Sequence, residues 1–229
     1  MPSERFTLPC AEPPLSAVLD APAGAPRASA ILLAHGAGYH MDSPWMERVA
    51  LGLAAHGFPV LRFNYPYQER ARARGHALPP DRQPVLEEAH AVALAALAER
   101  MPGSRILLAG KSMGGRIATY LAAKGERCAG LVLFGYPLHP PKQPARTRSE
   151  HFPTLAQPAL FLQGTRDEFA DLALLRAALG RYGGQATLEV IEGADHGFHV
   201  PRSSGTTDDQ VFARLLERVS SWERATFPA

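Results

Sequence analysis

The sequence has few cysteines, little net charge and no long apolar run. Cys10 and Cys128 are the two cysteines of 229 residues and lie far apart, so we expect no disulfide framework and a reducing compartment. A formal net charge of +2 gives no basic surface of the kind that binds nucleic acid or membranes. No apolar run is long enough to span a bilayer, and the first residues lack a signal-peptide pattern. These absences predict a cytoplasmic protein with neither nucleic-acid nor membrane partners.

Short apolar runs alternate with helical patterns along the chain. The composition, 46% hydrophobic and 20% charged, is ordinary for a globular protein, and the length suits one domain. Most of the apolar runs are continuous, as expected of parallel strands covered on both faces. The strands expected from these runs are residues 30–34, 59–64, 106–109, 131–134, 159–162 and 186–191, with a possible antiparallel edge strand at 15–19. The helices expected between them are residues 43–56, 83–100, 112–124, 169–182 and 208–224.

This alternation predicts an α/β fold with a mostly parallel, doubly wound sheet and flanking helices. We expect a single domain over residues 1–229, with a catalytic core at about 29–226. Residues 136–158 interrupt the alternation and are rich in proline, so they form either a minimal lid or an irregular connection. Cations in this segment suggest a positive wall that selects anionic acyl substrates, unless they point outward (Lys142, Arg146 and Arg148). A second basic cluster could mark an anion site, but we expect it to be a solvated loop (Arg70, Arg72 and Arg74).

The most informative feature of the chain is the sequence G-K-S-M-G at residues 110–114. It follows an apolar strand pattern and opens into a helical pattern, which is the context of a nucleophile elbow. At such an elbow the serine, here Ser112, sits on a tight, strained turn and presents its hydroxyl above the sheet. The flanking Gly110 and Gly114 avoid side-chain collisions across the turn. The amide of Met113 is then a candidate oxyanion donor.

The same residues also end like a phosphate-binding loop, G-x-x-x-x-G-K-[ST]. That loop requires a glycine at position 105, which is Arg105, and a flexible run where this chain has an apolar strand. A buried strand cannot surround phosphates, so we reject the nucleotide-binding interpretation.

A serine hydroxyl needs a base to accept its proton. In the fold that carries this elbow, an acid and then a histidine follow the serine in sequence, each on a loop after a strand. His196 follows the last predicted strand and has a glycine on either side, Gly193 and Gly197, so we expect it to be the base. The other histidines are assigned elsewhere: surface positions for His56, His76 and His90, a structural role for His35, and no metal site for His199.

Asp167 is the expected acid, because it follows the strand at 159–162 and orders correctly between Ser112 and His196. Glu168 is the second choice. Asp171 fits the first turn of the following helix. Asp195 directly precedes the histidine and cannot easily reach its imidazole.

A second oxyanion donor is expected after the first strong strand, in the sequence H-G-A-G at residues 35–38. Ala37 is the preferred donor and Gly38 the next. By itself this sequence is equally typical of an ordinary glycine-rich turn.

Together these residues resemble the α/β-hydrolase superfamily, from Ala30 onward. Within it the chain is similar to the small dienelactone-hydrolase-like proteins, in a clade that also includes a subunit of a chromatin acetyltransferase complex. The sequences that carry this resemblance are residues 35–38, 62–65, 110–116, 135–141, 163–167 and 194–196. The resemblance implies the fold and a triad of Ser112, Asp167 and His196. It implies no substrate, and Ser112 departs from the cysteine nucleophile of true dienelactone hydrolases.

The sequence therefore predicts a serine hydrolase that cleaves an ester or related acyl compound through an acyl-enzyme on Ser112. The partner is a small-molecule acyl substrate, and the chemistry calls for no cofactor and no metal. Thioesterase, peptidase and lipase activities stay open, as does the oligomeric state. The alternative is a catalytically silent scaffold or binding protein with the same fold.

Overall fold

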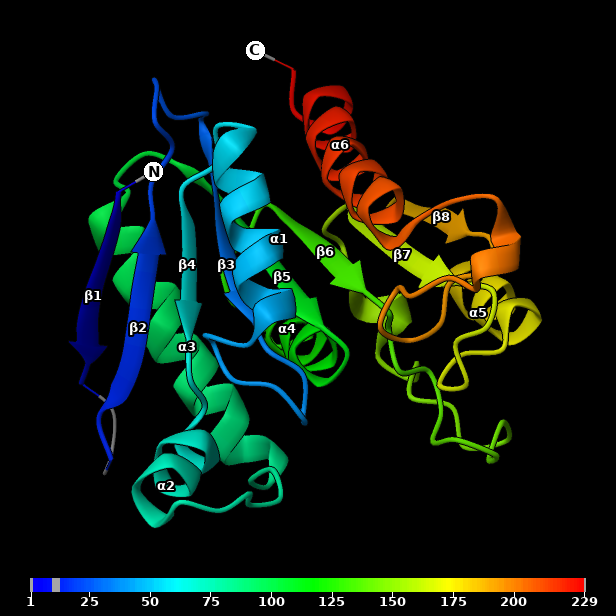
Figure 1. Ribbon diagram of the computed structural model, residues 1–229, viewed down its shortest axis with the longest axis horizontal. Coiled ribbons are helices and arrows are strands. Elements are labelled where there is room, and N and C mark those ends of the chain that lie inside the picture. Colours follow the sequence, from blue (N-terminus) through cyan, green and yellow to red (C-terminus); the bar gives the residue numbers. More distant parts are fainter. Residues whose placement is uncertain (1, 10–12, 229) are drawn as a thin grey trace.

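The computed structural model describes residues 2–9 and 13–228, and one twisted sheet runs through them (Figure 1). The strand order is β1-β2-β4-β3-β5-β6-β7-β8. β1 and β2 pair antiparallel, as do β2 and β4, and every pair from β4 to β8 is parallel. The strands are β1 (Ser3–Leu8), β2 (Leu15–Asp20), β3 (Ser29–Ala34), β4 (Val60–Phe63), β5 (Arg105–Lys111), β6 (Gly130–Phe134), β7 (Ala159–Gly164) and β8 (Ala186–Ile191).

Helices cover both faces of the sheet. The helices are α1 (Pro44–Ala55), α2 (Pro66–Arg74), α3 (Gln83–Arg100), α4 (Met113–Ala123), α5 (Leu172–Leu179) and α6 (Asp208–Thr226). One hydrophobic core lies between the sheet and α3, α4 and α5, and a second lies between the sheet and α1 and α6. Figure 1 shows this division, with α1 and α6 in front of the strands and α3 and α4 behind them. This arrangement confirms the predicted α/β fold and its doubly wound, mostly parallel sheet.

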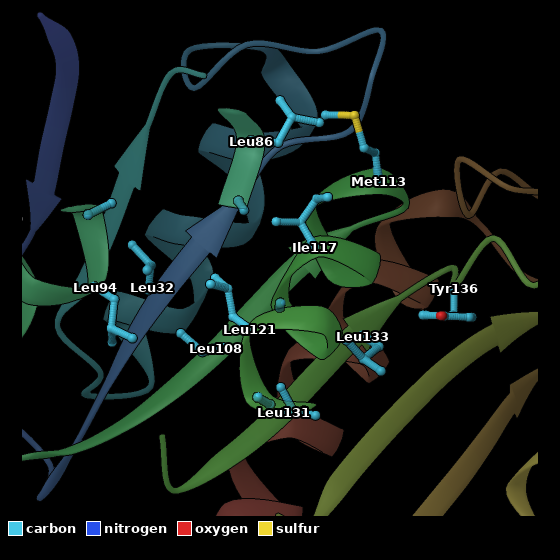
Figure 2. Close-up of a cluster of buried hydrophobic side chains, with 14 of the residues drawn as sticks. Leu32, Leu86, Leu94, Leu108, Met113, Ile117, Leu121, Leu131, Leu133 and Tyr136 are labelled. Atoms are coloured by element: carbon cyan, nitrogen blue, oxygen red, sulfur yellow. The ribbon is translucent and has the colours of Figure 1, made fainter. Parts of the chain in front are cut away.

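The continuous apolar strands supply both cores at once, because successive side chains point to opposite faces. In β3, Leu32 packs in the first core while Ile31 and Leu33 pack in the second. Figure 2 shows the first core, where Ile117 and Leu121 of α4 face the strands. This packing fixes α4 against the sheet, and therefore fixes the turn that precedes α4.

The N-terminal edge of the sheet differs from the sequence prediction. β2 is antiparallel as expected, but it is not the edge, because β1 pairs along its full length. β1 has little apolar signal, since of its residues only Leu8 is buried. Its edge position explains this composition, because most of its side chains face solvent.

The prediction that the basic cluster at residues 70–74 is a solvated loop is wrong, because these residues belong to α2. Pro66 occupies the first turn of this helix, a position that suits proline because no backbone donor is lost. Glu69 ties α2 to the sheet, since its Oε1 accepts from the Ser16 amide at 2.9 Å and from Asn64 Nδ2 at 3.0 Å. The buried residues of this short helix are Pro66, Tyr67 and Ala71, which give too little apolar periodicity to indicate a helix from the sequence.

The prediction that His90 is a surface residue is wrong. His90 lies on α3 with no exposed surface, and its Nδ1 is 3.0 Å from the Tyr65 hydroxyl. Burial lowers the pKa of His90 to about 3. Its imidazole is therefore a neutral member of the core. α5 is also shorter than predicted, because residues 169–171 form the turn that leads into it.

The segment at 136–158 is an irregular connection that packs against the body of the protein. The Tyr136 hydroxyl donates to the Arg148 carbonyl at 2.6 Å, and His151 Nε2 lies 2.8 Å from Thr119 Oγ1 on α4. Tyr136 and Phe152 are fully buried. These anchors make the segment one wall beside the elbow.

Two further sequence expectations concern the cysteines and membrane-spanning helices. Cys10 lies outside them, and Cys128 is a free thiol. Among the residues that the structure describes, no helix combines the length and the apolar character needed to cross a bilayer.

Candidate active site

Ser112 lies on the turn between β5 and α4, where the packing of glycines forces a sharp backbone reversal. Its φ of 50° is in the left-handed region, which is strained for a residue with a side chain. A Cβ on Gly110 would overlap the backbone of Gly115, and a Cβ on Gly114 would overlap the carbonyl of Ala34. The two glycines of the G-x-S-x-G sequence are therefore required by close backbone approach.

Three side chains from three loops meet at the carboxyl end of the parallel strands. Ser112 follows β5, Asp167 follows β7 and His196 follows β8, and these strands end at the same edge of the sheet (Figure 1). Ser112 Oγ lies 2.9 Å from His196 Nε2, and His196 Nδ1 lies 2.7 Å from Asp167 Oδ2. A carboxylate can only accept, so the neutral imidazole carries its proton on Nδ1 and leaves Nε2 to accept from the serine hydroxyl. The structure thus brings together the three residues of the predicted triad.

Asp167 is fixed by three donors. Besides His196, Gln163 Nε2 donates to Oδ2 at 2.5 Å, and the Phe169 amide donates to Oδ1 at 2.8 Å. The Asp167 side chain is fully buried. The ring of Phe169 also packs on the imidazole of His196, with centroids 4.3 Å apart. The carboxylate and the imidazole are therefore held in one orientation before any substrate arrives.

The competing acids have other roles. Glu168 is exposed. Asp171 is the N-cap of α5 and accepts from the Leu174 amide, so it precedes the helix rather than lying within its first turn. Asp195 Oδ1 accepts from the Gly197 and His199 amides and thereby shapes the loop that carries His196. Among the described residues, the hydrogen-bond partners of the His196 imidazole are Asp167 and Ser112, and none of these three acids.

The loop at residues 35–38 lies against the elbow. The ring of His35 is fully buried, and burial lowers its pKa to about 4, so it is neutral. His35 Nδ1 lies 2.8 Å from the Gly36 carbonyl, and its Nε2 accepts from the Tyr65 amide at 3.2 Å. The Tyr67 hydroxyl donates to the Ala37 carbonyl at 3.0 Å. His35 therefore has the structural role expected of it, which is to brace this loop.

A cavity of about 270 Å³ opens at the elbow. Ser112, Met113 and Ala37 line it, so both predicted oxyanion residues of first choice border the same space as the serine. Gly38 does not line it. Figure 2 shows Met113 beside Leu86 of α3, which is also part of this wall.

The three cations selected in residues 136–158 do not lie together. Arg148 lines the cavity of Ser112, but Lys142 lines a separate cavity beside Glu168. Arg146 is exposed and donates to Gln143. The predicted positive wall is therefore reduced to Arg148. Arg116, which sequence analysis did not select, lines the cavity as well.

Lys111 is a second residue that sequence analysis missed. Its side chain is buried, its Nζ donates to the His196 carbonyl, and its ammonium lies 5.8 Å from the Trp45 ring and 5.6 Å from the Phe198 ring. A Cβ on Gly135 would lie 3.0 Å from Lys111 Nζ and 3.3 Å from both Asp167 Oδ2 and His196 Nδ1. The lysine therefore packs directly behind the acid and the base.

Burial lowers the pKa of Lys111 to about 8 from its usual value of 10.5, against the opposing effect of Asp167. Between these two pH values the unfolded chain holds a proton that the folded chain has released, so folding stability rises with pH. The free energy of unfolding of wild type, relative to that of Lys111→Met, should therefore increase by about 1–3 kcal/mol as the pH rises from 8 to 10.5. Urea unfolding of both proteins across this range measures the difference. A constant difference would show that Lys111 keeps its ordinary pKa.

The described residues contain no group of three or more histidine, cysteine, aspartate or glutamate side chains arranged to hold a metal ion. His199 pairs instead with Asp208, with Nδ1 and Oδ2 2.6 Å apart.

A family model described as an alpha/beta hydrolase domain matches residues 27–224 of the chain. Solved structures resemble it over nearly their full length. A dienelactone hydrolase from Anabaena variabilis is 23% identical, with a TM-score of 0.74 and coverage of 98% of this chain and 97% of that chain. An α/β serine hydrolase without lid from Xanthomonas campestris is 22% identical, with a TM-score of 0.73 and coverage of 99% and 96%. An α/β serine hydrolase homologue from Coxiella burnetii is 20% identical, with a TM-score of 0.73 and coverage of 95% and 96%. At these identities the likeness shows the fold.

Proposed function

Because the chain belongs to the alpha/beta hydrolase family, we propose that it is a serine hydrolase that cleaves a small carboxylic ester through an acyl-enzyme on Ser112. The observation that carries this proposal is the continuous contact from Ser112 Oγ through His196 to Asp167, at 2.9 Å and 2.7 Å. A serine at a strained elbow with a base in hydrogen-bond contact and an acid orienting that base has the arrangement of an activated nucleophile.

In the first step, Ser112 Oγ attacks the ester carbonyl while His196 Nε2 takes the hydroxyl proton. The carbonyl π electrons move to oxygen, and the amides of Met113 and Ala37 donate to that oxyanion. The tetrahedral intermediate then collapses: the oxyanion electrons re-form the carbonyl, the bond to the leaving-group oxygen breaks, and the imidazolium gives its proton to that oxygen, which departs as the alcohol. The acyl group remains on Ser112 as an ester.

In the second step, a water molecule attacks the acyl-enzyme, and His196 now accepts a proton from that water. Collapse of the second intermediate breaks the bond to Ser112 Oγ, which regains its proton from His196 and releases the carboxylic acid. Asp167 holds the imidazole and stabilises its charged form in both steps. Every proton transfer uses a protein group or water, so the reaction as written needs neither metal nor cofactor.

The size of the cavity supports a small substrate. Its volume of about 270 Å³ is just below the usual range for ligand pockets, which starts at about 300 Å³. The similar structures include a dienelactone hydrolase, so small esters are the class to test first. A silent scaffold would give no role to a strained serine or to a buried acid that is bonded to its base. We also propose that the chain acts as one domain, because a single sheet runs through it.

The acyl-enzyme can be tested by partitioning between water and an added alcohol. Phenyl butyrate and p-nitrophenyl butyrate would form the same butyryl-Ser112, so hydrolysis in dilute methanol should give the same ratio of methyl butyrate to butyric acid from both. The corresponding butyryl thioester and butyryl anilide, run in parallel, rank ester, thioester and amide cleavage. A ratio that changes with the leaving group would indicate direct attack by water, and no turnover of any butyryl compound would contradict the proposed function.

A further inference from the structure

Resting on the proposed hydrolase function, we propose that Arg116 and Arg148 form a binding site for a carboxylate group of the ester substrate, beside Ser112. Arg116 comes from the first turn of α4, four residues after Ser112, and Arg148 comes from the irregular segment after β6. Both side chains line the same cavity as the serine. The site would therefore act on the bound substrate rather than on its approach from solution.

The two guanidinium groups have few partners: Arg116 lies over the Tyr120 ring, 5.9 Å from its centroid. Arg116 Nε is buried and has no hydrogen-bond partner. Arg148 Nη1 donates only to the Pro137 carbonyl, in a long bond of 3.3 Å. Within residues 2–9 and 13–228, neither guanidinium forms a salt bridge with a carboxylate. Since Arg116 Nε is covered, the donors left for an anionic ligand in the cavity are the terminal N–H groups of the two guanidinium groups.

The charge balance of the cavity also favours an anion. Among the described residues, Asp81 is the one acidic residue of its lining; its Oδ1 pairs with Arg70 of α2, and its buried Oδ2 has no hydrogen-bond partner. Burial lowers the pKa of Arg148, and repulsion by Arg116 lowers it further. Two cations that repel each other without a counter-ion raise the free energy of the empty site, and a bound carboxylate would relieve that repulsion.

The shape of the donors and of the wall indicates the class of anion. A guanidinium presents paired N–H groups that match the two oxygens of a carboxylate. Ile117, Pro137 and Phe169 supply apolar surface in the same cavity, which suits a short hydrocarbon part between carboxylate and ester. The expected substrates are therefore small esters that carry a carboxylate.

Two matched pairs of esters test this site. The p-nitrophenyl monoester of glutaric acid is compared with p-nitrophenyl pentanoate, which has an uncharged acyl chain of equal length. p-Acetoxybenzoate is compared with its methyl ester, so that the carboxylate lies on the leaving group instead. We expect the ratio of kcat/KM, charged over neutral, to fall about 10- to 100-fold in Arg116→Gln and in Arg148→Gln for at least one pair, the range for hydrogen bonds to charged groups.

Arg146→Gln is the matched control, because it removes one positive charge from the same segment outside the cavity. An equal loss in Arg146→Gln would overturn the site in favour of general electrostatic attraction, as would unchanged ratios in both cavity variants. Arg148→Lys keeps the charge and should retain part of the preference, which separates binding from any disturbance of the wall.

A binding measurement separates this inference from the proposed function. Calorimetric titration of Ser112→Ala with monoethyl glutarate requires no turnover. Binding that disappears in Ser112→Ala combined with Arg116→Gln and Arg148→Gln supports the site even if no ester is hydrolysed. Turnover of neutral esters, with no binding of monoethyl glutarate and no dependence of the ratios on these arginines, overturns the site and leaves the hydrolase function intact.

Discussion

Replacing Ser112 with alanine is expected to lower kcat for p-nitrophenyl butyrate about a million-fold. A loss of this size is typical when the nucleophile of a serine hydrolase is removed. Alanine keeps a Cβ at the strained elbow, so the turn and the first core should persist. The hydroxyl that contacts His196 Nε2 at 2.9 Å is the atom removed. Steady-state kinetics of purified protein measure the loss, and thermal unfolding followed by circular dichroism verifies that the variant is folded.

Ser203→Ala is the matched control, because Ser203 is exposed on the loop before α6 and lies outside the cavity of the elbow. It should hydrolyse the ester at the wild-type rate. Activity in Ser112→Ala within about tenfold of wild type would mean that another residue supplies the nucleophile, since general binding and oxyanion contacts alone leave far less.

Asp167→Asn is expected to lower kcat about 10⁴-fold with little change in the fold. The carboxylate now accepts from His196 Nδ1, Gln163 Nε2 and the Phe169 amide. An asparagine amide nitrogen at Oδ2 would face donors instead of accepting from them, and it would favour the imidazole tautomer with its proton on Nε2. That tautomer cannot accept the serine proton.

Glu168→Gln makes the same chemical change at the neighbouring, exposed residue and should stay near wild-type activity. The pair therefore separates the two acids that sequence reasoning left in competition. A collapse in Glu168→Gln, together with near wild-type kcat in Asp167→Asn, would reverse the assignment of the acid.

The strands that form the parallel part of the sheet could be predicted because burial on both faces makes them continuously apolar. The run Ile106 to Ala109 is an example, and it lies within β5 with side chains in both cores. β1 and α2 could not be predicted in this way, because β1 exposes most of its side chains and α2 is rich in arginine. β1 is held by pairing with β2, and α2 is held by the hydrogen bond from the Ser16 amide to Glu69. Both interactions join parts of the chain that a local sequence pattern does not relate.

The candidate triad could be selected because its members follow strand ends, and parallel strands end at one edge. The charged residues around it could not. Lys111 resembles part of a phosphate-binding sequence, and only the packing of the loops after β6 and β8 buries it. From the sequence alone, Arg116 is expected to be a solvent-exposed residue of a helix. It borders the cavity only because residues 136–158 fold beside α4. Of the cations selected in that segment, Arg148 alone borders the cavity of Ser112, because residues near 142–146 project away from it.

The central claim is that Ser112 is an activated nucleophile, and labelling with a fluorophosphonate probe tests it most directly. Phosphonylation requires attack by an activated serine oxygen and is independent of the natural substrate. Mass spectrometry of the digested protein should find one adduct, on the peptide that carries Ser112, and Ser112→Ala should remain unlabelled. An unlabelled Ser112 in folded wild-type protein, or an adduct on a different serine, would contradict the account.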